Sequence, residues 1–295
     1  MTSIFSSGDL APLYVGVVSF LITRDIIIPN ENNDNFFKLI IGDWLSPYYE
    51  PARDSTANMM MMGAILGYVI MAGSVSVLDL IPLESWKTQG RKSYFTLSTW
   101  LKVVATCLFN MFICSWTVVT PVWVAHRTGV FRNYSPLTTE SAPIDPVECI
   151  KNFAIHMIVI DVWFYSTHKL LHYGPLFSWI HKMHHTYHAP TAVACMYAHP
   201  VEYCIGNVLG VILGPCLTNC HPYECAFWMT YSLASTSASH SGYFFLGATD
   251  HDAHHEHFYC NYGVGVFMDK LFKTEYEGSD LQKKVNRRIG AHTPQ

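Results

Sequence analysis

Long apolar runs without charge alternate with short polar segments along the chain. Four runs contain no Asp, Glu, Lys or Arg, and these are residues 59–78, 103–125, 203–223 and 225–249. A fifth run, residues 153–167, is interrupted only by His156 and Asp161. Because a bilayer-spanning helix needs about 20 predominantly apolar residues, each run can cross or nearly cross a membrane. The pattern predicts an all-α fold, an integral membrane helical bundle with about four to five spanning or re-entrant helices.

Composition favours a membrane protein over a large soluble core. Half of the 295 residues are hydrophobic, only 14% are charged and the mean hydropathy is +0.18, whereas soluble domains carry roughly 25% charged residues. The nine cysteines include no Cys-x-x-Cys pair, which argues against a disulfide framework or a zinc ribbon. We expect Cys216 and Cys220 to pack within an apolar run. The net charge of −4 indicates no particular partner, and nothing indicates nucleic acid.

The order of apolar and polar stretches divides the chain into three regions. We expect an N-terminal membrane region at 1–145, a histidine-containing domain at 146–277 and a basic cytosolic tail at 278–295. The first thirty residues lack a basic start before an apolar stretch, so no cleavable signal peptide is expected. The short apolar stretch at 10–23 is an interfacial or additional helix.

The positions of lysine and arginine predict the orientation in the membrane. Positive residues in short loops favour the cytosolic side. Here they occupy the loop 87–92, the region around Lys169 and Lys182, and the tail at 283–288. Two apolar hairpins with one returning helix between them place these charges, and every histidine cluster, on the cytosolic side. The histidines would then form a helical cap facing the cytosol, and the sequon at Asn133 would lie in the lumen.

Three histidine clusters lie between and beyond the apolar runs of the second half. They are His168-x3-His172, His181-x2-His184-His185 and His251-x2-His254-His255. Residues three or four apart lie on one face of a helix, so each cluster is expected to point its imidazoles in one direction. One such pair arises easily by chance among sixteen histidines, whereas three in this order favour a metal site. Because a single metal rarely takes more than six ligands, eight histidines predict two metals side by side.

The ligand type narrows the choice of metal. Imidazole suits zinc, copper, iron and nickel. Soluble di-iron bundles use Glu-x-x-His pairs, and this chain has none. An all-histidine di-iron site at a membrane face is the alternative arrangement, in which neutral ligands leave the iron highly charged. A metal transporter would instead carry its histidines at mid-depth in the spanning helices, whereas here they cluster at helix ends and in polar loops.

The clusters and their surroundings resemble the membrane fatty acid hydroxylase/sterol desaturase superfamily, whose pattern is His-x3-His, His-x2-His-His, His-x2-His-His. The stretch 161–172 (DVWFYSTHKLLH) looks like the first box of that family, and 197–202 (YAHPVE) is similar to a stretch of sterol 4-methyl oxidases and close relatives. Residues 239–243 (SHSGY) precede the last box, and 261–263 (NYG) follow it, as in relatives. The resemblance covers about residues 148–277, which makes 146–277 a fatty acid hydroxylase-type catalytic domain. The first 145 residues match only in hydropathy.

The resemblance implies two iron ions and nine histidine ligands. These ligands are His168, His172, His181, His184, His185, His240, His251, His254 and His255. Four further residues are expected to support a ligand from its outer side or to contact the substrate, and these are Asp161, His199, Glu202 and Asn261. A carboxylate such as Asp161 or Glu202 can hold the second ring nitrogen of a ligand. For His199 a direct ligand role stays open beside the supporting role that we favour.

The resemblance also implies an activity. A protein of this kind is an O2-dependent di-iron monooxygenase of the endoplasmic reticulum membrane that hydroxylates a lipid C–H bond, with the 4-methyl group of a sterol as the first choice. A fatty acyl or sphingolipid hydroxylase and a sterol desaturase are the alternatives. Two alternatives of another kind remain for the function: a membrane metal-binding or transport protein, and a catalytically inactive paralogue.

Only seven residues separate Tyr243 from His251, fewer than sterol 4-methyl oxidases usually have, which leaves the substrate open. No flavin, haem or dinucleotide motif is present, so a separate electron donor such as cytochrome b5 or its reductase is expected.

Overall fold

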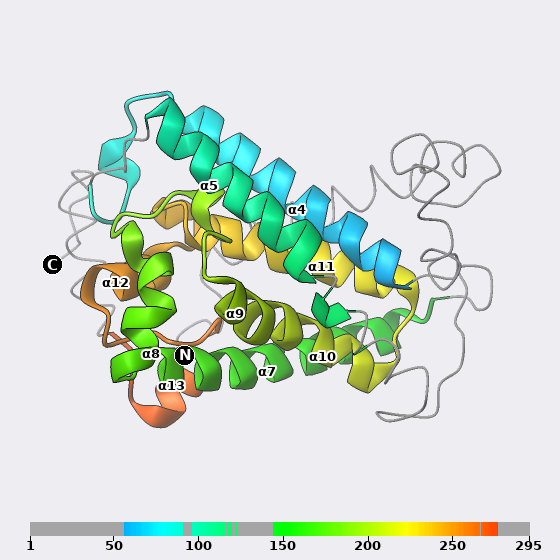
Figure 1. Cartoon of the computed structure of the whole chain (residues 1–295). Helices are drawn as coiled ribbons and strands as arrows, with labels where there is room; N and C mark the ends of the chain where they lie inside the picture. Colours follow the sequence, from blue (N-terminus) through cyan, green and yellow to red (C-terminus); the bar gives the residue numbers. More distant parts are fainter. Residues whose placement is uncertain are drawn as a thin grey trace, which may run out of the picture.

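The computed structural model describes residues 56–90, 96–115, 117–119, 122, 144–265 and 267–276. These residues form helices joined by turns, with one isolated β-bridge between Lys87 and Tyr243 and no strand among them. Figure 1 shows long helices running side by side and a group of short helices at one end. The predicted all-α class is confirmed.

Three helices in the described part of the chain are long and apolar enough to cross a membrane. They are Met59–Leu78, Leu97–Val119 and Pro200–Thr218. The predicted run at 153–167 is helical as well, within α7 (Pro146–Leu171), and the first part of the run at 225–249 lies in α11 (Pro222–Ser239). The arrangement is that of a membrane helical bundle, as predicted.

Two of the predicted apolar runs end earlier than expected. The helix that begins at Pro200 ends at Thr218, because Asn219 adopts a left-handed conformation with φ 48°. The last run was expected to continue to residue 249, but α11 ends at Ser239. After it the chain turns at Gly242, where φ is 73°, a conformation that glycine adopts without steric cost. The remaining apolar residues of that run therefore belong to the cap.

The second spanning helix begins earlier than its apolar run. Helix α5 (Leu97–Phe109) starts after Thr96, whose side chain accepts a hydrogen bond from the Thr99 amide at 3.2 Å and so caps the helix. It continues as the π-helical turn η4 (Asn110–Cys114). Its predicted end at residue 125 lies outside the described residues, as do the stretch 10–23, the sequon and the basic tail.

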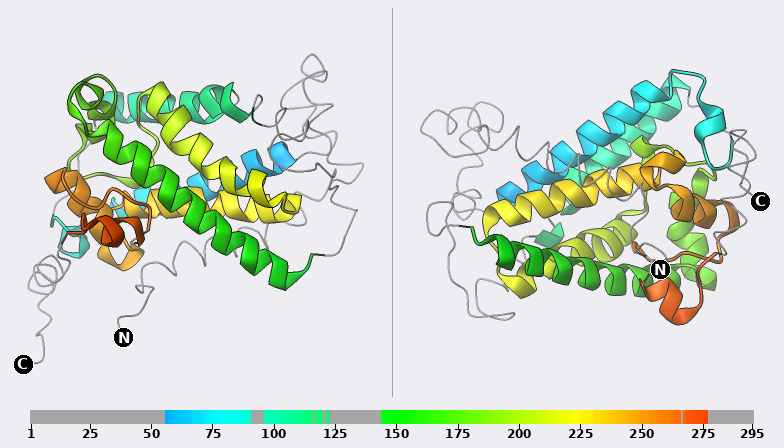
Figure 2. Two further views of the ribbon diagram at one scale, coloured as in Figure 1. Left: turned by 90° about the horizontal axis from the view of Figure 1, so that it is seen from below. Right: turned by 180° about the vertical axis from the view of Figure 1, so that it is seen from behind.

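Two close helix pairs build the bundle. In Figures 1 and 2, α4 (Thr56–Leu78) lies alongside α11, and α10 (Leu209–Thr218) lies alongside α7. A Cβ added to Gly63 or Gly67 of α4 would lie 2.3 Å from a carbonyl oxygen of α11. The two backbones therefore touch, as they do where small residues four apart face a neighbouring helix in membranes. Since α4 belongs to the predicted N-terminal region and α11 to the predicted histidine-containing domain, the two regions share one core.

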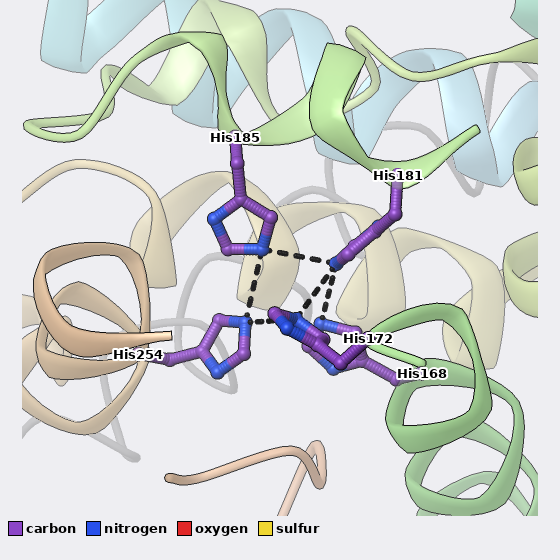
Figure 3. A group of neighbouring side chains, drawn as sticks. All are labelled: His168, His172, His181, His185 and His254. Carbon is purple, nitrogen blue, oxygen red and sulfur yellow. Dashed lines mark hydrogen bonds between the residues drawn. The ribbon is translucent and has the colours of Figure 1, made fainter. Parts of the chain in front are cut away.

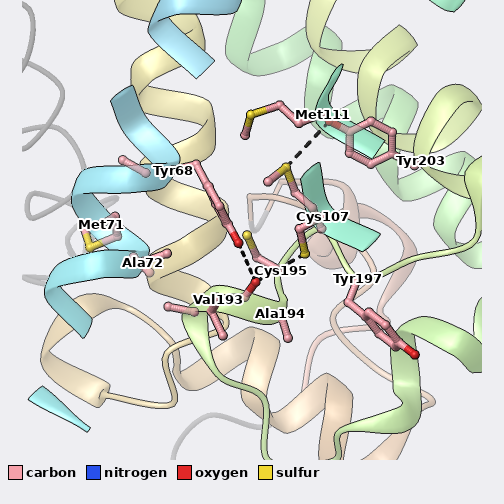
Figure 4. Packing of buried hydrophobic residues seen from close by; sticks show 14 of the residues in the cluster. Tyr68, Met71, Ala72, Cys107, Met111, Val193, Ala194, Cys195, Tyr197 and Tyr203 are labelled. Carbon is pink, nitrogen blue, oxygen red and sulfur yellow. Dashed lines mark hydrogen bonds between the residues drawn. The ribbon is translucent and has the colours of Figure 1, made fainter. Parts of the chain in front are cut away.

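A buried loop runs through the middle of this core. Residues 191–198 are buried, and their carbonyl groups need partners away from water. Tyr68 Oη donates to the carbonyl of Val193 at 2.8 Å, and Asn110 Nδ2 donates to those of Met196 and Ala198 at 2.9 and 3.0 Å. Figure 4 shows the side chains of α4, α5 and this loop packed together. The loop connects the second histidine cluster with the helix that begins at Pro200, and so fixes where both lie.

Short elements at one end of the bundle carry six of the nine histidines predicted as ligands (Figure 1). They are α8 (Gly174–Trp179), η5 (His181–Thr186), η8 (Phe244–Leu246), α12 (Thr249–His257) and α13 (Phe267–Phe272). The first cluster lies at the end of α7, and His240 follows α11. All these segments therefore meet at the same end of the long helices.

Candidate metal centre

The structure brings all nine predicted histidines together, in two groups. The five-histidine group contains His168, His172, His181, His185 and His254, and the four-histidine group contains His184, His240, His251 and His255. Within each group, one ring nitrogen of every residue lies within 4.8 Å of the others. Seven of the nine side chains are buried, and the other two, His172 and His251, are partly buried.

The second and third clusters each divide between the two groups. We expected each cluster to point in one direction, and this is wrong for both. The second cluster forms a 3₁₀ helix, η5, and the third lies on the short α-helix α12. Consecutive residues on an α-helix point about 100° apart, and on a 3₁₀ helix about 120°. The adjacent pairs His184–His185 and His254–His255 therefore place one imidazole in each group.

Close nitrogen contacts define the five-histidine group (Figure 3). His181 Nε2 lies 3.0 Å from the Nε2 atoms of His168 and His172 and 2.9 Å from that of His185. His254 Nε2 lies 3.1 Å from His172 Nε2 and 3.2 Å from His185 Nε2. Metal–imidazole bonds of about 2.0–2.1 Å at right angles put neighbouring ligand nitrogens about 3.0 Å apart. The spacing therefore fits five ligands around one ion.

The tautomers of two of these histidines also suit a bound cation. His168 Nδ1 donates to the Tyr262 carbonyl at 2.7 Å, and His254 Nδ1 donates to the Cys260 carbonyl at 2.6 Å. A carbonyl only accepts, so each neutral ring carries its proton on Nδ1 and presents a bare lone pair at Nε2. Lone pairs that converge in this way cannot satisfy one another. A metal ion between them does.

The four-histidine group repeats this arrangement. His240 Nδ1 donates to the Thr236 carbonyl at 2.7 Å, which leaves its Nε2 bare. That Nε2 lies 3.0 Å from His251 Nε2 and 3.3 Å from His184 Nε2, and His255 Nε2 lies 3.2 Å from His251 Nε2. With four protein ligands instead of five, this group leaves more of an ion's coordination sphere to other ligands.

Burial keeps these imidazoles neutral at physiological pH. It lowers the pKa of His184 to about 4 and those of His172 and His240 to about 3, because the charged form loses its solvation. In His172 and His240, neighbouring imidazoles lower it further. Only neutral imidazole binds a metal, so the site needs no deprotonation before it can do so at pH 7.

Of the four predicted supporting residues, Glu202 contacts a histidine of the groups. Its Oε1 lies 2.9 Å from His181 Nδ1, the ring nitrogen that faces away from the five-histidine group. A carboxylate in this position fixes the orientation of the ring and raises its basicity as a ligand. The same contact was expected for Asp161, but there the structure differs. The Asp161 carboxylate accepts hydrogen bonds from the amides of Gly265 at 2.8 Å and Met268 at 3.0 Å.

The other two predicted residues shape the backbone around the centre. His199 lies outside both groups and caps the helix that follows it, since its Nδ1 accepts from the Val201 amide at 3.2 Å. Asn261 Nδ2 donates to the Asp250 carbonyl at 2.9 Å, and its Oδ1 accepts from the Tyr276 amide at 2.7 Å. It therefore ties the start of α12 to the segment that follows α13.

Sequence reasoning missed the carbonyl groups that orient three of the histidines. These belong to Thr236, Cys260 and Tyr262. Two of them flank Asn261, whose φ of 53° turns the backbone there. Asn is among the few residues that readily adopt this left-handed conformation. The Asn-Tyr-Gly stretch at 261–263 was the sequence signal available for this feature. The atoms that orient the histidines, however, belong to the main chain and not to the side chains.

Helices able to span a membrane and nine histidines at one end of them define a membrane protein with a histidine-rich candidate metal centre. The family model "Fatty acid hydroxylase" matches residues 153–274. The methylsterol monooxygenase erg25B of Aspergillus fumigatus is 30% identical over 262 residues, which cover 82% of this chain and 86% of that protein. The chain belongs to the fatty acid hydroxylase family, whose members include oxidoreductases that act on lipids.

Other relatives match over a smaller part of their own length. The fatty acid hydroxylase ahd1 of Mycosarcoma maydis is 26% identical over 82% of this chain, and the match spans 63% of that protein. The human fatty acid hydroxylase domain-containing protein 2 is 39% identical over 41% of this chain and 38% of its own length. No solved structure matches the chain.

Proposed function

We propose that the protein is a membrane-bound di-iron monooxygenase that hydroxylates a lipid C–H bond. The observation that carries the proposal is the pair of adjoining histidine groups at the end of apolar helices, with ring nitrogens that converge in each. Iron bound there would supply the redox chemistry that activates O2, which zinc cannot do.

The protein's own residues hold and shield this chemistry. Nine neutral imidazoles would bind the two ions, and the carbonyls of Thr236, Cys260 and Tyr262 keep the ring nitrogens of three of them aimed inward. The Glu202 carboxylate lies against the outer ring nitrogen of His181. Because most of these side chains are buried, bulk water is kept away from the reacting carbon. No side chain needs to act as a nucleophile.

The 4-methyl group of a sterol is the proposed site of hydroxylation. Relatives from Aspergillus fumigatus, Candida albicans and Rattus norvegicus are named as methylsterol monooxygenases or a C-4 methylsterol oxidase. A fatty acyl or sphingolipid hydroxylase is the second candidate, because the ahd1 protein is named as a fatty acid hydroxylase and the interval 244–250 is short. A metal transporter is disfavoured because the histidines lie at the ends of the helices.

The remaining parts of the proposal concern the surroundings of the site. The protein would lie in the endoplasmic reticulum membrane with its histidines facing the cytosol, where cytochrome b5 or its reductase would supply electrons. Residues 146–277 would form the catalytic domain between the membrane region 1–145 and the basic tail 278–295.

Lipid analysis of cells that lack the gene tests the substrate. Accumulation of 4-methylsterols, reversed by the wild-type chain but not by a His184→Ala variant, is the expected result. Normal sterols together with a loss of hydroxylated acyl chains would overturn the sterol assignment and favour the second candidate. Metal analysis of the purified protein tests the centre, and a content below two ions per chain after loading would contradict it.

A further inference from the structure

An ion pair between a buried lysine and a partly buried aspartate lies beside the histidine centre, just after the end of α4. Lys87, expected from its sequence position in a loop to face the cytosol, is only 2% exposed. Its Nζ lies 2.7 Å from Asp79 Oδ1. Removing an ammonium group from water costs several kcal/mol unless charges and hydrogen bonds compensate. A lysine in this position therefore needs its specific contacts.

Those contacts are made with the turn that follows His240. Lys87 Nζ donates to the carbonyl of Ser241 at 2.9 Å, and its side chain covers the ring of Tyr243, with Nζ 4.5 Å from the ring centre. The backbone of Lys87 pairs with that of Tyr243 in the isolated β-bridge. The Thr88 amide donates to the Gly242 carbonyl at 2.8 Å. We call residues 87–89 the strap, since they run along this turn and hold it by side chain and backbone.

The strap and Asp79 also contact the segment that follows the second histidine cluster. Tyr243 Oη donates to Asp79 Oδ1 at 3.0 Å, and Thr191 Oγ1 donates to Asp79 Oδ2 at 3.4 Å. Gln89 Nε2 donates to the His188 carbonyl at 2.5 Å. Asp79 and the strap thus join the chain just after His185 to the chain just after His240.

Both joined segments supply the four-histidine group. His240 serves that group alone, and His184 belongs to it as well. The five-histidine group takes two members from the end of α7, and none of the bonds made by Lys87 reaches that helix. A shift of the turn at 241–243 would therefore move a ligand of the four-histidine group and leave the first cluster where it is.

We propose that Lys87, paired with Asp79, is a positioning residue that holds the turn after His240 so that the His240 ring faces the four-histidine group. The inference rests on the two-ion part of the proposed function, but on neither iron nor the substrate. An ion pair, rather than apolar packing, suits this role because its hydrogen bonds fix one geometry.

Zinc binding separates this role from activity. Wild-type protein that is stripped with a chelator and loaded with Zn²⁺ alone should bind two ions per chain. The Lys87→Met variant should keep tight binding at the five-histidine group. It should bind the second ion, at the four-histidine group, about 10–100-fold more weakly, as is typical when a residue that supports a ligand is removed. Lys151→Met is the matched control, since Lys151 forms an exposed pair with Glu148 and lies far along α7 from His168 and His172. Lys87→Arg keeps the charge and should restore part of the second site.

The outcomes are distinct. Two equally tight zinc ions in Lys87→Met would overturn the inference, and so would weakening of both ions to the same degree, which indicates general unfolding. If Lys87→Met does not fold, Tyr243→Phe removes a single hydroxyl from the Asp79 network and should weaken the second ion alone, whereas unchanged binding would count against the proposal. A wild-type chain that binds fewer than two zinc ions would contradict the proposed centre itself. Two zinc ions without lipid oxidation by the iron-loaded protein would contradict only the proposed activity.

Discussion

Replacing Gly67 by alanine should separate α4 from α11. The added Cβ would lie 2.3 Å from the Thr230 carbonyl oxygen, about 1 Å closer than an ordinary van der Waals contact. Because the obstacle is helix backbone, the helices must move apart by a similar distance. A gap of that size removes a quarter to a half of the dispersion energy of each contact. Overpacking of this kind costs typically about 1–3 kcal/mol, and the better helix propensity of alanine returns at most ~1 kcal/mol.

Gly73→Ala is the control on the same helix. A Cβ at Gly73 would meet nothing within 4 Å, so the substitution should leave stability unchanged or raise it by up to ~1 kcal/mol. Thermal or SDS unfolding in detergent, followed by circular dichroism, measures the difference. Since α11 ends directly before His240, Gly67→Ala should also weaken zinc binding at the four-histidine group. Equal stabilities for the two variants would refute the close backbone contact between α4 and α11.

Three further predictions concern the histidines. His184→Ala and His254→Ala each remove one histidine from a different group. Each substitution should abolish turnover while the helix content stays normal. Near-normal product formation by both variants would show that these clusters are not catalytic. His199→Ala should keep both metal ions and lose about 10–100-fold in activity, because His199 lies outside both groups; loss of an ion, measured by metal analysis, would make it a ligand. Metal-free protein should lose stability as the pH falls from about 6.5 toward 4, because unfolded histidines take up protons in this range while burial keeps the pKa of folded His184 at about 4. A pH-independent unfolding temperature between pH 7 and 5 would contradict that burial.

Local sequence determined much of the fold and the identity of the candidate ligands. The charge-free run at 59–78 and the helix through the first cluster were predictable because hydropathy and helical periodicity depend on neighbouring residues alone. The end of α11 was not, because residues 240–249 remain free of charge while the turn at Gly242 and the contacts of the strap interrupt the helix. Hydropathy does not detect such an interruption.

The division of the histidines between two groups could not be read from their spacing. It depends on the 3₁₀ geometry of η5 and on the direction from which α12 approaches, which distant contacts determine. The burial of Lys87 was unpredictable for the same reason, since its partners Asp79 and Ser241 lie in two segments far apart in sequence. The close approach of α4 and α11 had a sequence signal, glycines four apart at 63 and 67, but that signal does not name the partner helix.

The buried loop that ends at Ala198 has a consequence for biosynthesis. Tyr68 is translated 125 residues before Val193, and Asn110 is translated 86 residues before Met196. At typical elongation rates these donors wait on the order of 10 s in the membrane for their carbonyl partners. Helices α4 and α5 are therefore synthesised before the segment that they later anchor has left the ribosome. The last histidine cluster is translated later still, so neither histidine group is complete until residue 255 has been added to the chain.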